Sequence, residues 1–250
     1  MRRHVCRVAA VAMLGASVSP ALATCNDAPA PGVNWFNCDL SEAQLAGEDL
    51  EGAVLGRSRL EGANLEGAHL RRADLTSVSA AGVNLRDANL SRARLSSGDF
   101  TDADLSGSDL RDARAGRADF EGARLDGAIA TGIDLNSARM RGASLQDADL
   151  SGASLRRTGL RELQAARAKL AGADLNGADL EGANLSGAEM RQVDLRDANL
   201  VDVDFTDADL GRADLRGADL SGAEFTEARL GSTLWTDGRR CRPTSVGECQ

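Results

Sequence analysis

Apolar side chains recur along this chain at a constant step of five residues. From Leu40 to Trp235 every fifth position is apolar, and these 40 positions comprise 29 Leu, 4 Phe, 4 Ala, 2 Met and 1 Trp without one insertion or deletion. Two residues earlier, from Cys38 to Thr233, 27 of 40 positions are Ala, and the residue between is Asp or Asn at 21 of 40. A fixed period held this long predicts a repeat architecture.

A step of five fits neither regular secondary structure. On an α-helix, five residues advance by about 140°, which scatters the large side chains around the axis. On an unbroken strand, an odd period places alternate side chains on opposite faces. The chain must therefore turn within each repeat. Extended Ala-Asp-Leu sends Ala and Leu inward and Asp outward, and the remaining two residues, often Ser-Gly or Glu-Gly, form the turn.

The phrase A-[DN]-L-x-x, which covers residues 36–235, resembles the motif of the pentapeptide repeat family. The resemblance implies an all-β fold, a right-handed quadrilateral parallel β-helix with four repeats per coil. About ten coils at about 4.8 Å each make a rod on the order of 48 Å long.

Several residues are spaced as a coil of four repeats requires. Two pairs of phenylalanines lie 20 residues apart, namely Phe100 with Phe120 and Phe205 with Phe225. We expect each pair to stack on one face. Departures from Ala also fall in one column, at Cys38, Ser58, Val78 and Gly98.

The stretch RELQAARAKL, residues 161–170, keeps the frame but loses the phrase. Leu163 stands where Ala belongs, and Ala165 stands where Leu belongs. The composition of this stretch favours helix. We predict a distorted coil here, with a local helical bulge as the alternative.

Residues 1–23, MRRHVCRVAAVAMLGASVSPALA, have the three parts of a secretory signal peptide: an arginine-containing start, an apolar run and a closing Ala-Leu-Ala. We predict cleavage after Ala23 and export, to the periplasm. The apolar run is too short for a permanent transmembrane helix. Lipid attachment at Cys25 is an alternative, although Thr24 is not the small residue expected directly before a lipidated cysteine.

Cleavage removes Cys6 and leaves four cysteines, an even number that predicts disulfides in an oxidising compartment. We favour the two local pairings, Cys25 with Cys38 and Cys241 with Cys249, because the long body between the pairs keeps the ends apart. The two other pairings and a metal site remain alternatives.

The ends of such a coil expose unpaired backbone and an apolar interior. Residues placed to plug the interior are Trp35 and Phe36 at the start and Leu234 and Trp235 at the finish. The predicted divisions are a signal peptide over 1–23, an N-terminal cap over 24–35, the β-helix over 36–235 and a disulfide-clamped C-terminal cap over 236–250.

Charge is unevenly distributed along the chain. The formal net charge is −9, and loss of the three leader arginines gives −9 − 3 = −12 for the mature chain. Residues 171–230 hold 14 acidic and 5 basic side chains, whereas residues 111–170 hold 8 acidic and 11 basic ones. The overall sign argues against direct nucleic-acid binding.

The densest charged runs are the candidate partner-binding residues. The acidic run is Asp202, Asp204, Asp207 and Asp209, and the basic run is Arg156, Arg157, Arg161, Arg167 and Lys169. They are either ordinary solvated outward positions or a docking surface for a partner of opposite charge.

The sequence offers no constellation for catalysis. His69 is the one histidine outside the leader, and it stands at an outward Asp or Asn position, which favours a surface substitution over a general base. The column Asp174, Asp194 and Asp214 could hold a cation weakly, but pairing with arginines and solvation is the ordinary expectation. Phosphate-cradling and nucleotide motifs are missing. We predict no catalytic, cofactor-binding or metal-binding residues and a non-enzymatic protein.

These observations predict an exported scaffold that presents charged faces to a protein or envelope partner. The resemblance supplies the alternative, since some pentapeptide repeat proteins bind DNA gyrase as acidic rods resembling duplex DNA. Those proteins act in the cytoplasm, so this alternative requires an uncleaved leader. The tail GSTLWTDGRRCRPTSVGECQ lacks the apolar helical pattern that such dimers use, and we make no prediction of oligomeric state.

Overall fold

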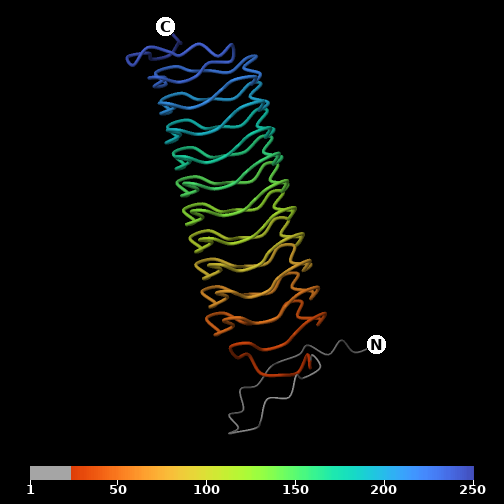
Figure 1. Cartoon of the computed structure of the whole chain (residues 1–250). Helices are drawn as coiled ribbons and strands as arrows, with labels where there is room; N and C mark the ends of the chain where they lie inside the picture. Colours follow the sequence, from red (N-terminus) through yellow and green to blue (C-terminus); the bar gives the residue numbers. More distant parts are fainter. Residues whose placement is uncertain (1–23) are drawn as a thin grey trace.

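A computed structural model of the chain describes residues 24–250. They form one long stack of coils, with the described N-terminal residues at one end of the rod and the C-terminus at the other (Figure 1). The predicted signal peptide, residues 1–23, and its cleavage site at Ala23 lie outside the described residues.

Parallel backbone bridges define the coil. Each middle residue of a repeat pairs with the residue 20 positions later, from Asn34 with Val54 to Asp214 with Leu234. One coil therefore takes 20 residues and has four sides. Each side is so short between its turns that pairing is confined to single residues, and the part of the chain from 24 to 250 contains neither a helix nor a longer strand.

Each side ends in a turn with one repeated geometry. Every fifth residue from Gly32 to Ser232 has a positive φ, between 54° and 75°. A hydrogen bond closes each turn, from the backbone N–H of one residue to the carbonyl oxygen of the inward residue three positions before it. For example, the N–H of Ala178 donates to the carbonyl oxygen of Leu175 at 3.0 Å. A positive φ at the third residue defines a type II turn, which explains the frequent glycine there. Arg, Asp and Ser also adopt this conformation here, held by the hydrogen bonds between coils.

The preference for Asp or Asn at the middle position has a local cause. Its side-chain oxygen accepts a hydrogen bond from the backbone N–H two residues on, as from Ser186 N to Asn184 Oδ1 at 3.0 Å and from Arg196 N to Asp194 Oδ1 at 3.1 Å. This bond satisfies a turn N–H and mimics a backbone turn, which is a known property of these two residues.

The inward Leu and Ala columns form a continuous buried core along the axis. The predicted aromatic stacks are confirmed. The ring centroids of Phe100 and Phe120 lie 5.2 Å apart at an interplanar angle of 12°, and those of Phe205 and Phe225 lie 5.1 Å apart at 15°. Identical side chains one coil apart therefore stack along the rod.

Gly98 makes room for one of these rings. A Cβ atom at Gly98 lies only 2.6 Å from Cε2 of Phe100 and 3.2 Å from Cγ2 of Val78. The departure from Ala at this position therefore compensates for the large ring in the same repeat.

We predict that Gly98→Ala lowers the free energy of unfolding by about 1–3 kcal/mol, because it overpacks the core against the Phe100 ring. Urea denaturation followed by circular dichroism measures the change. Gly159→Ala is the matched control, since a Cβ there meets nothing closer than the Ala138 carbonyl oxygen at 4.0 Å. Equal stability of Gly98→Ala and the parent would contradict this account of the ring packing.

The prediction of a distorted coil over 161–170 is wrong. This stretch has the same turns as its neighbours, and Gln164 pairs with Ser144 and Asn184 in the ordinary register. Leu163 and Ala165 are both buried, so the large and small inward side chains have exchanged places within one repeat. The exchange nearly conserves volume and leaves a cavity of about 10 Å³. Packing therefore overrides the local helical propensity.

The plug prediction holds for the tryptophans and is wrong for their neighbours. Trp35 is 1% exposed, and the ring centroid of Trp235 lies 5.5 Å from that of Phe225. Phe36 is 43% exposed, with the Arg57 guanidinium carbon 5.8 Å from its ring centroid. Leu234 occupies an outward bridging position. The repeat frame explains this, because Phe36 is the first residue of a turn and Leu234 the middle of a side.

Both ends carry a disulfide, and the pairings are the local ones, Cys25 with Cys38 and Cys241 with Cys249. The tail then returns over the last coil in antiparallel pairing. Leu230 N donates to Ser245 O and Cys241 N donates to Thr233 O, both at 2.9 Å. The tail therefore pairs part of the otherwise open edge of the last coil.

Candidate functional site

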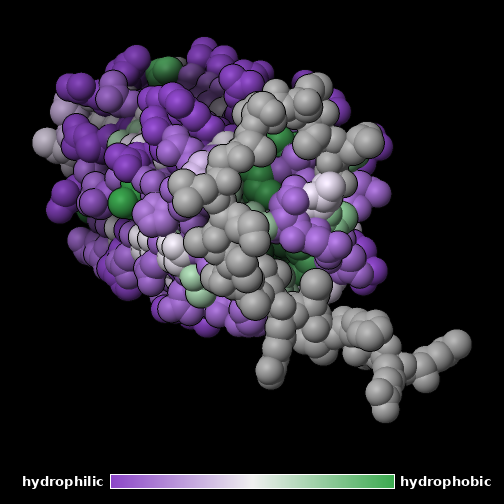
Figure 2. Space-filling view, turned by 90° about the horizontal axis from the view of Figure 1, so that it is seen from below, coloured by the Kyte–Doolittle hydropathy of each residue, from purple (hydrophilic) through white to green (hydrophobic). Residues whose placement is uncertain are grey.

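The outer sides of the rod are the candidate interaction surface. Figure 2, which looks along the rod from its N-terminal end, shows sides that are mainly hydrophilic with isolated hydrophobic residues. The exposed large apolar side chains in the described chain are few and far apart, at Phe36, Ile129 and Val246. Recognition along the sides therefore depends on charged and polar groups.

The acidic run spans two consecutive sides of one coil. Asp202 and Asp207 stand at the positive-φ turn positions and are exposed. Asp204 and Asp209 stand at middle positions, where their Oδ1 atoms accept the N–H of the residue two positions on, at 2.8 and 3.0 Å. Two of the four carboxylates are therefore fixed by the backbone, whereas those of Asp202 and Asp207 are exposed and form no ion pair with the described residues.

The basic run is largely tied to carboxylates of adjacent coils. Three members form ion pairs: Arg156 with Asp174 at 3.2 Å, Arg161 with Asp179 and Glu181 at 2.6 Å each, and Arg167 with Asp147 at 2.7 Å. Arg157 and Lys169 form no ion pair within residues 24–250. The side-chain hydrogen bond from Arg167 lowers the pKa of Asp147.

A simple spacing rule, which the sequence analysis missed, identifies many of these pairs. An arginine at the first turn position reaches the middle carboxylate 18 residues later. The pairs are Arg86 with Asp104, Arg156 with Asp174, Arg161 with Asp179, Arg191 with Asp209 and Arg196 with Asp214. An Arg-to-Asp spacing of 18 is therefore one sequence signal for pairing between coils. A spacing of 20 is another, as for Arg92 with Asp112 and Arg167 with Asp147.

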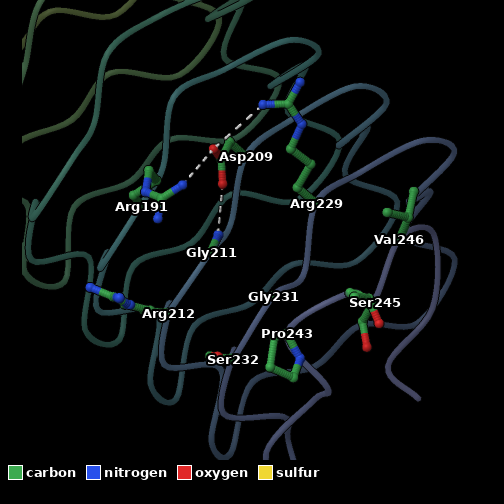
Figure 3. Close-up of a pocket in the computed structure, with 11 residues that line it drawn as sticks. Arg191, Asp209, Gly211, Arg212, Arg229, Gly231, Ser232, Pro243, Ser245 and Val246 are labelled. Carbon is green, nitrogen blue, oxygen red and sulfur yellow. Dashed lines mark hydrogen bonds and ion pairs between the residues drawn. The ribbon is translucent and has the colours of Figure 1, made fainter.

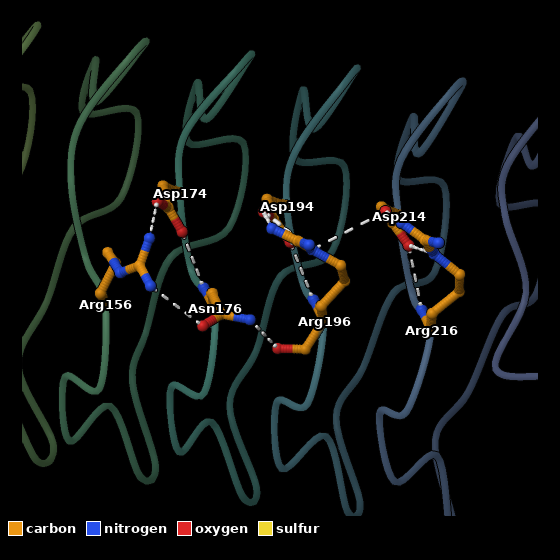
Figure 4. A network of polar contacts seen from close by, with 7 residues as sticks. All are labelled: Arg156, Asp174, Asn176, Asp194, Arg196, Asp214 and Arg216. Atoms are coloured by element: carbon orange, nitrogen blue, oxygen red, sulfur yellow. Dashed lines mark hydrogen bonds and ion pairs between the residues drawn. The ribbon is translucent and has the colours of Figure 1, made fainter.

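Arginines also supply the counter-charge for the carboxylate column (Figure 4). The Arg196 guanidinium lies 2.6 Å from an Asp194 oxygen and 3.8 Å from an Asp214 oxygen, and Arg216 lies 2.6 Å from Asp214. This matches the ordinary expectation for the column. No group of three metal-ligating side chains is arranged to hold an ion in the described part of the chain.

The arginines lower the pKa values of two carboxylates in this column. The Arg196 side chain, through its hydrogen bond, holds the pKa of Asp194 below its usual value, and Arg216 does the same to the pKa of Asp214. Because the folded-state pKa is depressed, these carboxylates stabilise the fold above their unfolded value of about 3.9 and lose that contribution as the pH falls through the folded-state value.

We expect Asp194→Asn to lower the free energy of unfolding at pH 7 by no more than about 1 kcal/mol, because Asn keeps the turn hydrogen bond and removes the charge and the Oδ2 acceptor of an exposed ion pair with Arg196. The difference should shrink as the pH falls from 7 to 2, since protonation discharges the parent carboxylate as well. Urea denaturation of both proteins at pH 7 and at pH 2 measures this difference in the free energy of unfolding. Asp134→Asn, in the same column but without an ion pair, is the control, and a difference that grows on acidification would refute the assignment.

His69 lies exposed on the outside and bridges through its backbone to Asp49 and Asn89. This is the predicted outward position. Among the described residues, no helix is long and apolar enough to cross a bilayer.

Comparisons with known proteins point to one family. The model for pentapeptide repeats matches residues 38–76, 73–112, 118–157, 166–200 and 198–233. HetL from the cyanobacterium Nostoc sp. strain PCC 7120, a protein involved in heterocyst differentiation regulation, is 33% identical over 84% of this chain and 92% of its own, with a TM-score of 0.71. No curated protein gives a match.

Two further solved structures are similar in sequence. QnrB1, a plasmid-mediated fluoroquinolone resistance protein, is 27% identical over 76% of this chain and 89% of its own, with a TM-score of 0.34. A pentapeptide repeat protein from the Arabidopsis thaliana thylakoid lumen is 33% identical over 40% of this chain and 63% of its own, with a TM-score of 0.28.

Proposed function

The chain belongs to the pentapeptide repeat family, and from that premise we propose that it is an exported, non-enzymatic scaffold. Its right-handed quadrilateral β-helix of about ten coils presents charged faces to a protein or envelope partner. One observation carries this proposal: the coils hold outward carboxylates and arginines at a regular spacing over a core that uses nearly all the large apolar side chains. A surface of this kind recognises partners by electrostatic complementarity.

Export is supported by the leader-like residues 1–23 and by the two disulfides, which persist in oxidising compartments. Fractionation followed by mass spectrometry of the N-terminus tests it. We expect a periplasmic chain beginning at Thr24. An acylated Cys25 would identify a lipoprotein, and a full-length cytoplasmic chain that retains Cys6 would contradict export.

The role of the acidic run in partner binding is tested by capture of proteins from an envelope fraction. The variant replaces Asp202, Asp204 and Asp209 by Asn, which keeps the turn hydrogen bonds. We expect it to lose the partner retained by the parent.

The control variant replaces Asp102, Asp104 and Asp109 by Asn. These residues lie in the same three columns five coils earlier, so the control matches backbone position and charge loss. Equal recovery of every captured protein by both variants would overturn the proposed docking face.

The acidic balance of residues 171–230 also favours a second candidate, a cytoplasmic mimic of duplex DNA that binds gyrase. A supercoiling assay with the purified chain separates the two functions. Inhibition of gyrase that is lost in the first Asn variant and kept in the control would support the DNA mimic. Unimpaired supercoiling supports the scaffold.

A further inference from the structure

A pocket of about 380 Å³ lies at the C-terminal end of the rod, between the last coils and the returning tail (Figure 3). Three arginines from neighbouring coils, Arg191, Arg212 and Arg229, line it together with Asp209. Residues 243–246 of the tail form another wall. A pocket of this size is within the range of small-molecule sites.

Two glycines in one turn column help to create the hollow. The first turn position is Arg191 in one coil, then Gly211 and Gly231 in the next two. A Cβ atom at Gly231 would lie 2.6 Å from the carbonyl oxygen of Pro243, so only glycine lets the tail approach this closely. A side chain at Gly211 would begin 3.0 Å from Asp209 and 3.6 Å from the Arg191 guanidinium. The glycines therefore keep the space between the arginines and the tail open.

Positive charge exceeds negative charge around this space. Asp209 lies 3.2 Å from the Arg191 guanidinium and 3.9 Å from that of Arg229. Arg212 is exposed and forms no ion pair with the described residues. Ser232 and Thr244, which carry hydroxyl groups, also line the pocket. Three guanidinium groups against one carboxylate leave an excess of two positive charges within the most acidic part of the rod.

We infer that this pocket binds a phosphate group, either free or as a phosphate monoester. The excess of two charges matches a phosphate dianion better than a single carboxylate. Planar guanidinium groups donate paired hydrogen bonds to phosphate oxygens, and the hydroxyls supply further donors. Arg212 is the group left available to bind the anion, while Asp209 positions its two arginine neighbours.

Calorimetric titration of the purified full chain with inorganic phosphate and with glucose 6-phosphate tests the site. We expect saturable binding of at least one probe, weakened about tenfold by Arg212→Gln, as for loss of a charge-assisted hydrogen bond. Ser232→Glu adds a carboxylate beside the arginines and should weaken the binding of phosphate similarly. The backbone can accept glutamate there, because Glu227 occupies the same kind of positive-φ turn position. Tighter binding of the ester would indicate a phosphorylated molecule, and equal binding would indicate free phosphate.

Arg72→Gln is the matched control, since Arg72 is exposed at the same kind of positive-φ turn and makes no ion pair with residues of the described chain. It should bind both probes as the parent does. Circular dichroism confirms that each variant keeps the fold. The inference is overturned if neither probe binds saturably up to about 10 mM, or if Arg212→Gln and Arg72→Gln bind equally well.

Discussion

Phe120→Ala is expected to lower the free energy of unfolding by about 3–5 kcal/mol, the usual cost of removing a buried aromatic ring. Phe120 is 1% exposed and stacks on Phe100 in the adjacent coil. Truncation therefore removes apolar burial and the aromatic contact together and leaves a cavity in a narrow core. Urea denaturation followed by circular dichroism measures the loss.

The control for this variant is Phe36→Ala. Phe36 is 43% exposed and lies on the outside beside Gly56 and Arg57, so its loss should cost no more than about 1 kcal/mol. Equal destabilisation by the two substitutions would mean that the inward column does not form the energetic core.

The Phe120 variant should also show where the rod opens. Coils in a solenoid contact only their neighbours, so the effect of one substitution is expected to spread over a few coils. Hydrogen exchange should increase most in peptides around residues 100–140 and least near the two disulfides. Uniform loss of protection along the chain would indicate instead that the rod unfolds as a single cooperative unit.

Removal of residues 239–250 is expected to cause self-association. The truncation frees the N–H of Leu230 and the carbonyl oxygen of Thr233, which otherwise pair with the tail. An open β-helix edge is a template for pairing with another chain. Light scattering after size-exclusion chromatography should show a mass that rises with concentration beyond that of the full chain.

The double variant Cys241→Ala with Cys249→Ala separates the tail from its cross-link. It keeps the antiparallel pairing partners and removes only the disulfide, so we expect lower stability, by about 2–4 kcal/mol, without the increase in mass. A truncated chain with the same mass as the full chain at every concentration would show that the tail does not protect the edge.

The five-residue period predicts most of this fold because inward and outward positions follow directly from it. Leucines such as Leu175 and Leu180 are buried at every step, and the middle positions bridge 20 residues apart. The exchange of Leu163 and Ala165 could not be judged from propensity, because its outcome depends on the volume of one shared core. The outward placement of Phe36 and Leu234 follows from the frame, which their apolar character obscured.

The candidate site was predictable only in part. The sequence locates the acidic run, but the fixing of Asp204 and Asp209 by turn N–H groups depends on the geometry of the type II turn. The pairing of Arg161 with Asp179 depends on how an arginine side chain at the first turn position extends toward the next coil, which the coil length alone does not specify. The pocket beside Arg212 depends on the path of the tail, which carries no repeat and hence no positional rule.

The uninterrupted 20-residue register makes the length of this rod adjustable in discrete steps. Duplication or deletion of one whole coil returns every column to its original side, so both capped ends keep their rotational setting and move by about 4.8 Å. An insertion of repeats whose number is not a multiple of four would also rotate one end relative to the other by quarter turns. Duplication of a coil in the gene can thus change the distance between the two terminal surfaces without changing either surface.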